Sequence, residues 1–258
     1  MEMNLLQAII FGIVEGITEF LPISSTGHLI LTAKLLQLEQ TTFLKSFEIA
    51  IQFGAILSVV VLYWKSLFVK REVMKRIAVA FIPTGILGLL LHGFVKQYLL
   101  SSNMTVVLSL LVGGILLIAF EFAHNEKEDA VEDVAHLSYW RAALIGVAQS
   151  VAMVPGVSRS AATIVGGMLA GLKRKTIVEF SFLLAVPTML AATVLDLSKS
   201  YKDFSADQFD VLAVGFIVSF FVALVSIKWL LRYVQRNTFV SFGVYRIAVA
   251  VLFLLFVL

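Results

Sequence analysis

One run near the N-terminus places ionisable and hydroxyl side chains inside an apolar stretch. The segment Gly12–His28 reads GIVEGITEFLPISSTGH. Ionisable groups at membrane depth are costly, so they usually face a cavity or pathway and mark function. The run therefore predicts a functional site. Its candidate residues are Glu15, Glu19, Ser24, Ser25, Thr26 and His28.

The spacing within this run predicts a broken helix. Glu15 and Glu19 are four residues apart, so on a helix their carboxylates share one face. Pro22 interrupts the helix because it has no N–H and clashes with the preceding turn. Ser24 and Ser25 are N-cap candidates for a second half-helix. A break of this kind in lipid needs shelter by protein or a water-lined cavity. We therefore expect the chain to dip into a membrane, turn, and point a helix N-terminus at a ligand.

A second run carries the complementary charge. It reads PGVSRSAAT from Pro155 to Thr163. Ser158 can cap the helix that follows, and Arg159 offers a planar, permanently charged fork suited to phosphate oxygens. Helix N-termini carry free N–H groups and a partial positive charge, and they bind anions, phosphate above all. Two such N-termini beside Arg159 predict a phosphate cradle, to which Ser160 and Thr163 add hydroxyl groups.

The two glutamates indicate chemistry in addition to binding. Two carboxylates repel a phosphate unless a divalent cation, which prefers hard oxygen ligands, lies between them. Alternatively, one glutamate is a general base, and a serine beside it can act as a nucleophile. His28 can orient a group, donate a proton or bind phosphate, or simply bond a loop carbonyl. These residue types suit phosphoryl transfer from an amphiphile whose head group reaches the membrane interior.

The composition is that of a polytopic membrane protein built from helices. Of 258 residues, 60% are hydrophobic and 14% charged, with a mean hydropathy of +0.97. Soluble domains are about a quarter charged, so that class is excluded. Cysteine is absent, which excludes disulfides and thiolate metal sites. We expect a bilayer around the chain and no nucleic-acid partner.

The apolar runs predict six spanning helices and two broken segments in a single integral membrane domain, residues 1–258. The broken segments are Leu5–Leu38, split at Pro22, and Ala142–Leu172, split at Pro155-Gly156. A span needs about 20 apolar residues. The predicted spans are Phe47–Tyr63, Ile77–Val95, Met104–Phe120, Val178–Leu195, Val211–Leu231 and Phe239–Leu258.

The two halves share one plan. Residues 1–121 and 139–258, joined by a polar loop at 122–138, each contain a broken segment and three spans. Gly12-x-x-Glu15 recurs as Gly146-x-x-Gln149. Because each half has an odd number of spans, the repeats are inverted, as in many transporter-like folds.

The basic residues orient these spans. Arg159 and Arg246 lie within membrane segments, and Lys34, Lys45, Lys96, Lys199 and Lys202 fall on one side of the predicted membrane. The remaining thirteen of the twenty Lys and Arg residues fall on the other side. The positive-inside rule therefore predicts both termini outside, with the first broken segment entering from outside and the second from inside. Their tips can then meet near the middle.

Two motifs carry a specific resemblance. EGxTEFLPxSSTGH and PGxSRSxxT, with FExxIQxGAI at Phe47–Ile56 and EFSFLLAVP at Glu179–Pro187, resemble the signatures of the undecaprenyl-diphosphatase, or bacitracin resistance, family. The resemblance covers nearly the whole chain. It implies dephosphorylation of undecaprenyl diphosphate, a polyprenyl diphosphate lipid, to the monophosphate carrier recycled in peptidoglycan synthesis. It also implies a divalent cation, Mg or Ca, and a multi-pass protein of the bacterial inner membrane with an outward-facing site.

The motifs also imply roles for individual residues. The catalytic set is Glu15, Glu19, Ser25, His28 and Arg159, and the substrate-binding set is Ser24, Thr26, Ser158, Ser160 and Thr163. We hypothesise that Ser25 attacks the terminal phosphorus, or positions a water that does, with Glu19 as base. Glu15, with Glu19, is the candidate cation ligand. Arg159, Ser158 and the half-helix amides would stabilise charge on the transferred group.

Several alternatives accompany this interpretation. Inverted repeats with broken helices are also transporter architecture, and a lipid-binding scaffold is a third class. The carboxylates beside a serine and an arginine favour chemistry. Glu48 and Glu179 are interpreted as acids at the start of spans, where they suit the helix dipole. The alternative for Glu48 is a contact with the site, on the helix face that it shares with Gln52. Arg246 is expected to pair structurally, and Glu121–Asp133 to be a solvated loop. Small-residue faces permit a homodimer.

Overall fold

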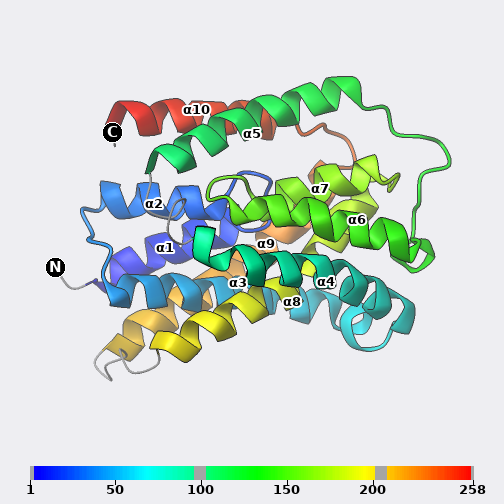
Figure 1. Ribbon diagram of the computed structural model, residues 1–258. Coiled ribbons are helices and arrows are strands. Elements are labelled where there is room, and N and C mark those ends of the chain that lie inside the picture. The colour runs from blue at the N-terminus through cyan, green and yellow to red at the C-terminus, as the bar shows by residue number, and fades with distance from the viewer. Residues whose placement is uncertain (1–2, 96–102, 201–207, 257–258) are drawn as a thin grey trace.

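The chain folds into a helical bundle, and in the part that the structure describes each half begins with two short helices and continues with three further helices (Figure 1). The computed structural model describes residues 3–95, 103–200 and 208–256. The first half comprises α1 (Leu5–Thr18), α2 (Ser25–Leu35), α3 (Thr42–Phe68), α4 (Arg71–Phe94) and α5 (Asn103–Ala123). The second comprises α6 (Tyr139–Ser150), α7 (Arg159–Leu169), α8 (Arg174–Ser200), α9 (Phe209–Tyr233) and α10 (Val240–Phe256). Short 3-10 turns lie at Val134–His136 and Val151–Met153.

The long helices have the character of membrane spans. Helices α3, α4, α5, α8 and α9 are long and apolar enough to cross a bilayer, and α1 and α10 are shorter apolar helices. Large apolar side chains such as Leu90, Phe122 and Leu255 are exposed on the outside of the bundle, as lipid-facing residues are. The prediction of an all-α, multi-pass membrane protein is confirmed.

Each broken segment ends its first helix ahead of its proline. Helix α1 ends at Thr18, four residues before Pro22, and α6 ends at Ser150, with a 3-10 turn before Pro155. A proline ring clashes with the carbonyl of the residue four positions earlier, so a regular α-helix stops near that residue. The predicted breaks are therefore present, and each is six to eight residues long (19–24 and 151–158).

A serine with an unusual backbone precedes each second half-helix. Ser24 and Ser158 have φ values of 73° and 74°, in the left-handed region that costs a non-glycine residue about 1–3 kcal/mol. Ser158 is the predicted cap, since its hydroxyl accepts from the Ala161 N–H at 3.2 Å. Of the two predicted candidates in the first break, Ser24 occupies the N-cap position but makes no side-chain cap bond, and Ser25 is the first helical residue.

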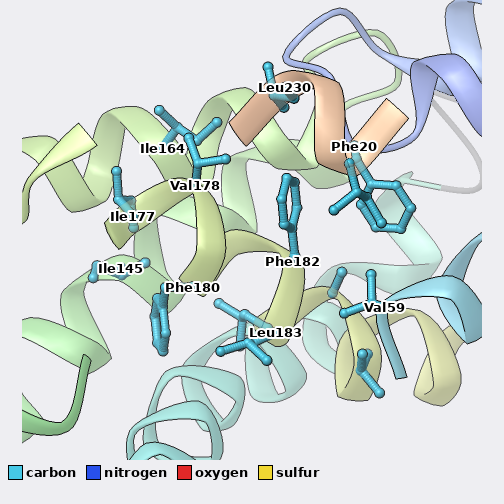
Figure 2. Close-up of a cluster of buried hydrophobic side chains, with 14 of the residues drawn as sticks. Phe20, Val59, Ile145, Ile164, Ile177, Val178, Phe180, Phe182, Leu183 and Leu230 are labelled. Atoms are coloured by element: carbon cyan, nitrogen blue, oxygen red, sulfur yellow. The ribbon is translucent and has the colours of Figure 1, made fainter. Parts of the chain in front are cut away.

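The buried apolar core lies around the first half of α8 and reaches the first break. Phe180, Phe182, Leu183 and Ile177 of α8 are among its members (Figure 2). Phe20, within the first break, contacts Phe182 edge-to-face with ring centroids 5.4 Å apart. Burial of such large rings stabilises the position of the segment that carries them. Around this core, α1 packs against α9, α6 packs against α4, and α5 pairs with α10.

One arginine holds both breaks together. The side chain of Arg246, in α10, has no exposed surface. Its guanidinium donates to five backbone carbonyls, at 2.9–3.4 Å: those of Pro22, Ser109, Leu110, Gly156 and Val157. Gly113 makes room, because a Cβ there would overlap the guanidinium. The predicted structural role of Arg246 is confirmed, with carbonyls as its partners.

Three acidic residues lie elsewhere than the sequence suggested. Helices α3 and α8 begin at Thr42 and Arg174, without an acid in the first turn, so Glu48 and Glu179 lie beyond it. The helix-dipole interpretation of both is wrong, because that effect is confined to the first turn. Glu121 belongs to α5 rather than to a solvated loop. Its nearly buried carboxylate pairs with both terminal nitrogens of Arg174 and accepts from the Phe239 N–H at 3.1 Å.

We expect Arg246→Met to destabilise the fold far more than Arg236→Met, which alters an exposed arginine. Each buried carbonyl left without a donor costs about 1–3 kcal/mol, so the loss of five such bonds should lower the unfolding midpoint by at least about 10 °C. Thermal unfolding of the detergent-solubilised variants measures this. Equal midpoints for the two variants would contradict the assigned role of Arg246.

Candidate active site

The tips of the two broken segments meet inside the bundle. Ser160 Oγ, in the first turn of α7, donates to the Phe20 carbonyl at 2.8 Å. Arg159 Nη2 lies 3.3 Å from Glu19 Oε1. These contacts join residues 140 positions apart in the chain. The sequence-predicted acids and serines of one tip and the arginine of the other are thus brought together.

Glu19 is shared between a serine and the arginine. Its Oε2 accepts from Ser25 Oγ at 2.5 Å, while its Oε1 accepts from Arg159. Both Glu19 and Ser25 are buried, with 7% and 9% of their surfaces exposed. Hydrogen bonds to an ionised carboxylate are short and strong, and this one points the serine proton at a possible base. Ser25, Glu19 and Arg159 therefore form a continuous chain of hydroxyl, carboxylate and guanidinium.

The guanidinium of Arg159 is fixed on two sides. Nη1 donates to the Ser181 carbonyl at 2.9 Å, and Nη2 to the carboxylate and the carbonyl of Glu19. The group also lies over the Phe20 ring, 5.9 Å from its centroid. Nε is buried and has no hydrogen-bond partner. A buried unpaired donor is rare, and beside a predicted phosphate cradle it is a donor available to an anion.

His28 is held by two partners. Its Nδ1 lies 2.8 Å from the Ser24 carbonyl and its Nε2 2.8 Å from the Tyr245 hydroxyl. Because a carbonyl only accepts, Nδ1 carries a proton. The alternative that His28 bonds a loop carbonyl is therefore present, and its catalytic role stays a prediction.

The five predicted substrate-binding residues differ in solvent exposure. Thr26 is exposed at the first tip, whereas Ser24 and Ser158 are buried at their helix starts. Ser160 and Thr163 have no exposed surface. Thr163 donates to the Arg159 carbonyl at 2.8 Å and to Gln149 Oε1 at 3.1 Å. The last two hydroxyls thus brace the tips, and a substrate-binding role for these five residues stays a prediction.

Glu15 is the unsatisfied member of the site. Its side chain is fully buried, and neither carboxylate oxygen has a hydrogen-bond partner. The charges of Glu19, Glu48 and Arg159 act on it. Across residues 3–95, 103–200 and 208–256, no group of three or more His, Cys, Asp or Glu side chains could hold a metal ion. The orphaned oxygens of Glu15 nevertheless fit a cation that takes its other ligands from a substrate or from water.

Sequence reasoning missed two residues of this region, Ser181 and Tyr245. Ser181 lies in the EFSFLLAVP motif, which was a usable signal. Tyr245 lies in an apolar helix, and nothing in its local sequence indicates a contact with His28.

The family model and the curated relatives that match this chain point to the same family. A family model described as bacitracin resistance protein BacA matches residues 8–252. A protein of Aquifex aeolicus named undecaprenyl-diphosphatase is 53% identical over 252 residues, covering 98% of each chain. Proteins of the same name from Persephonella marina (53% identical, 99% of this chain and 100% of the other) and Methanococcus aeolicus (46%, 98% and 99%) are similar over equal lengths. By motif, by matched length and by identity, this chain belongs to the BacA bacitracin resistance family.

Proposed function

We propose that this protein hydrolyses undecaprenyl diphosphate to undecaprenyl phosphate and inorganic phosphate. The curated relatives that match its whole length are named for this activity. The product is the lipid carrier that peptidoglycan synthesis reuses, and the family's description connects it with bacitracin resistance. The observation that carries the proposal is the chain of Ser25, Glu19 and Arg159 across the two tips.

In the proposed reaction Ser25 is the nucleophile. Its proton passes to Glu19 Oε2, 2.5 Å away, as Oγ bonds to the terminal phosphorus. The bond from that phosphorus to the bridging oxygen breaks, and undecaprenyl phosphate leaves with the proton that Glu19 had accepted. Water, deprotonated by the regenerated Glu19 carboxylate, then hydrolyses the phosphoserine and releases inorganic phosphate, and Glu19 returns this proton to Ser25 Oγ. In the variant of this mechanism that the sequence left open, Ser25 orients a water that attacks directly.

Arg159 and the start of α7 stabilise the transferred group. The unpartnered Nε–H of Arg159 is a preorganised donor, and the N-terminus of α7 adds its partial positive charge. Ser181 and Glu19 hold the guanidinium, so it does not reorganise when charge builds up on the phosphoryl oxygens. Glu15 would help to hold a divalent cation, which supplies charge neutralisation for the diphosphate.

The proposed membrane arrangement has six crossings, two re-entrant segments and an outward-facing site in the bacterial inner membrane. The distribution of basic residues supports it. An inverted repeat is supported by the packing: α1 against α9 corresponds to α6 against α4, while α5 pairs with its counterpart α10. The matching left-handed backbones of Ser24 and Ser158, each just before a second half-helix, agree with that correspondence.

We expect Glu19→Gln to lower phosphate release by about 10²–10⁴-fold, because the amide cannot accept the Ser25 proton. Release of inorganic phosphate from undecaprenyl diphosphate by detergent-purified protein measures it. The control is Glu128→Gln, which changes an exposed loop carboxylate. Equal rates for Glu19→Gln and the parent would remove Glu19 from the role of base.

Arg159→Lys should lower kcat by about 10²–10³-fold, because lysine keeps the charge but loses the fork that reaches Ser181, Glu19 and the phosphate at once. Arg71→Lys, which alters an exposed arginine, should leave kcat unchanged. If Arg159→Lys raised KM and left kcat unchanged, Arg159 would contribute to substrate binding alone.

Ser25→Ala should abolish turnover, because the variant cannot form the proposed phosphoserine intermediate. Acid quenching of the parent during turnover of substrate labelled at the terminal phosphate should leave label on Ser25. Absence of label in the parent, with Ser25→Ala still inactive, would assign the attack to water. Near-normal rates in Ser25→Ala would exclude both roles.

A further inference from the structure

A carboxylate on α3 faces the site without a role in the reaction described above. Glu48 Oε1 is buried and has no hydrogen-bond partner. Together with both oxygens of Glu15, this makes three buried carboxylate oxygens with no bonded partner. Such groups are rare in folded proteins, since burying an unpaired charge is strongly unfavourable, and each indicates a missing ligand.

The two carboxylates belong to helices that pack against each other, α1 and α3. Phe11 and Phe47 contact edge-to-face, with ring centroids 6.0 Å apart. Glu15 lies one turn after Phe11, and Glu48 directly follows Phe47. Both helices run from the end of the bundle where the N-terminus lies (Figure 1). The charge of Glu48 accordingly acts on Glu15.

Glu19 differs from this pair because its carboxylate is already engaged. One of its oxygens accepts from Ser25 and the other from Arg159. A cation bound through Glu19 would compete with both contacts. Glu15 has both oxygens unpartnered, and Glu48 keeps Oε1 unpartnered although its side chain also bonds Gln40. Lys45, the basic group that acts on Glu48, is exposed.

We propose that Glu15 and Glu48 bind the divalent cation, with substrate phosphate oxygens and water completing its coordination. Magnesium is commonly bound in this way, through one or two carboxylates and a phosphate, so a cluster of three acidic side chains is not required. This assignment rests on the proposed function for the diphosphate, and it replaces Glu19 by Glu48 in the expected ligand pair. Glu19 is then left for Ser25 and Arg159.

Glu179 provides a matched control. It occupies the corresponding place in the second half, where Val178-Glu179 parallels Phe47-Glu48. It is half-buried, and the basic groups Lys175 and Lys70 act on it. Two basic groups thus act on Glu179, whereas Lys45 is the basic group that acts on Glu48.

The test is Mn²⁺ binding to the detergent-purified full-length protein, followed by electron paramagnetic resonance, with and without inorganic diphosphate. Glu48→Gln and Glu15→Gln should each weaken binding at least tenfold. Glu19→Gln and Glu179→Gln should bind within about twofold of the parent. Diphosphate should tighten binding to the parent more than to Glu48→Gln.

Three results would overturn the assignment. Glu48→Gln could bind Mn²⁺ as tightly as the parent, Glu19→Gln could lose Mn²⁺ binding instead, or the parent could bind no Mn²⁺. Glu48→Asp, which keeps a carboxylate, guards against misfolding: it should bind Mn²⁺ more tightly than Glu48→Gln. Phosphate release from undecaprenyl diphosphate by the parent tests the proposed function separately from the cation site. If the parent releases phosphate and Glu48→Gln binds Mn²⁺ as the parent does, the function stands and the cation site is refuted. If the parent releases no phosphate, the function itself is refuted.

Discussion

Two helices that break inside an apolar bundle must bond the backbone groups that the breaks set free, and Arg246 bonds carbonyls of both breaks at once. Lipid offers no hydrogen bonds, so irregular backbone survives there only where protein or water satisfies it. The five carbonyls that Arg246 bonds belong to both breaks and to α5. A single buried cation therefore fixes where one tip lies relative to the other.

This fixed placement gives the site its chemistry. Glu19 comes from the tip of the first break and Arg159 from the start of α7, and neither half of the chain holds the pair by itself. Glu19 meets Ser25 on one oxygen and Arg159 on the other, so the proposed base and the proposed charge stabiliser are aligned before substrate binds. Ser160, fully buried, bonds across the same junction, and Thr163 bonds the Arg159 carbonyl within the second tip. Catalysis by preorganised groups requires such rigidity.

Much of this could be predicted from local sequence, because hydropathy, proline and motif spacing act over short ranges. The broken helices, the long apolar helices and the meeting of Glu19 with Arg159 followed from these signals. The five carbonyl partners of Arg246 did not, because they lie 89–224 residues away in the chain. Glu48 was misjudged because α3 starts at Thr42, capped by Thr41, ahead of the apolar run that defined the predicted span.

The central claim is that the two tips act as one catalytic unit, and a double-mutant cycle on kcat/KM for phosphate release tests it most directly. Glu19→Gln, Arg159→Lys and the double variant are compared with the parent. Groups that act as a unit are strongly non-additive. We therefore expect the double variant to be no more than a fewfold slower than the slower single variant. A double variant slowed by the full product of the two single effects would mean that the tips act independently, and would contradict the account.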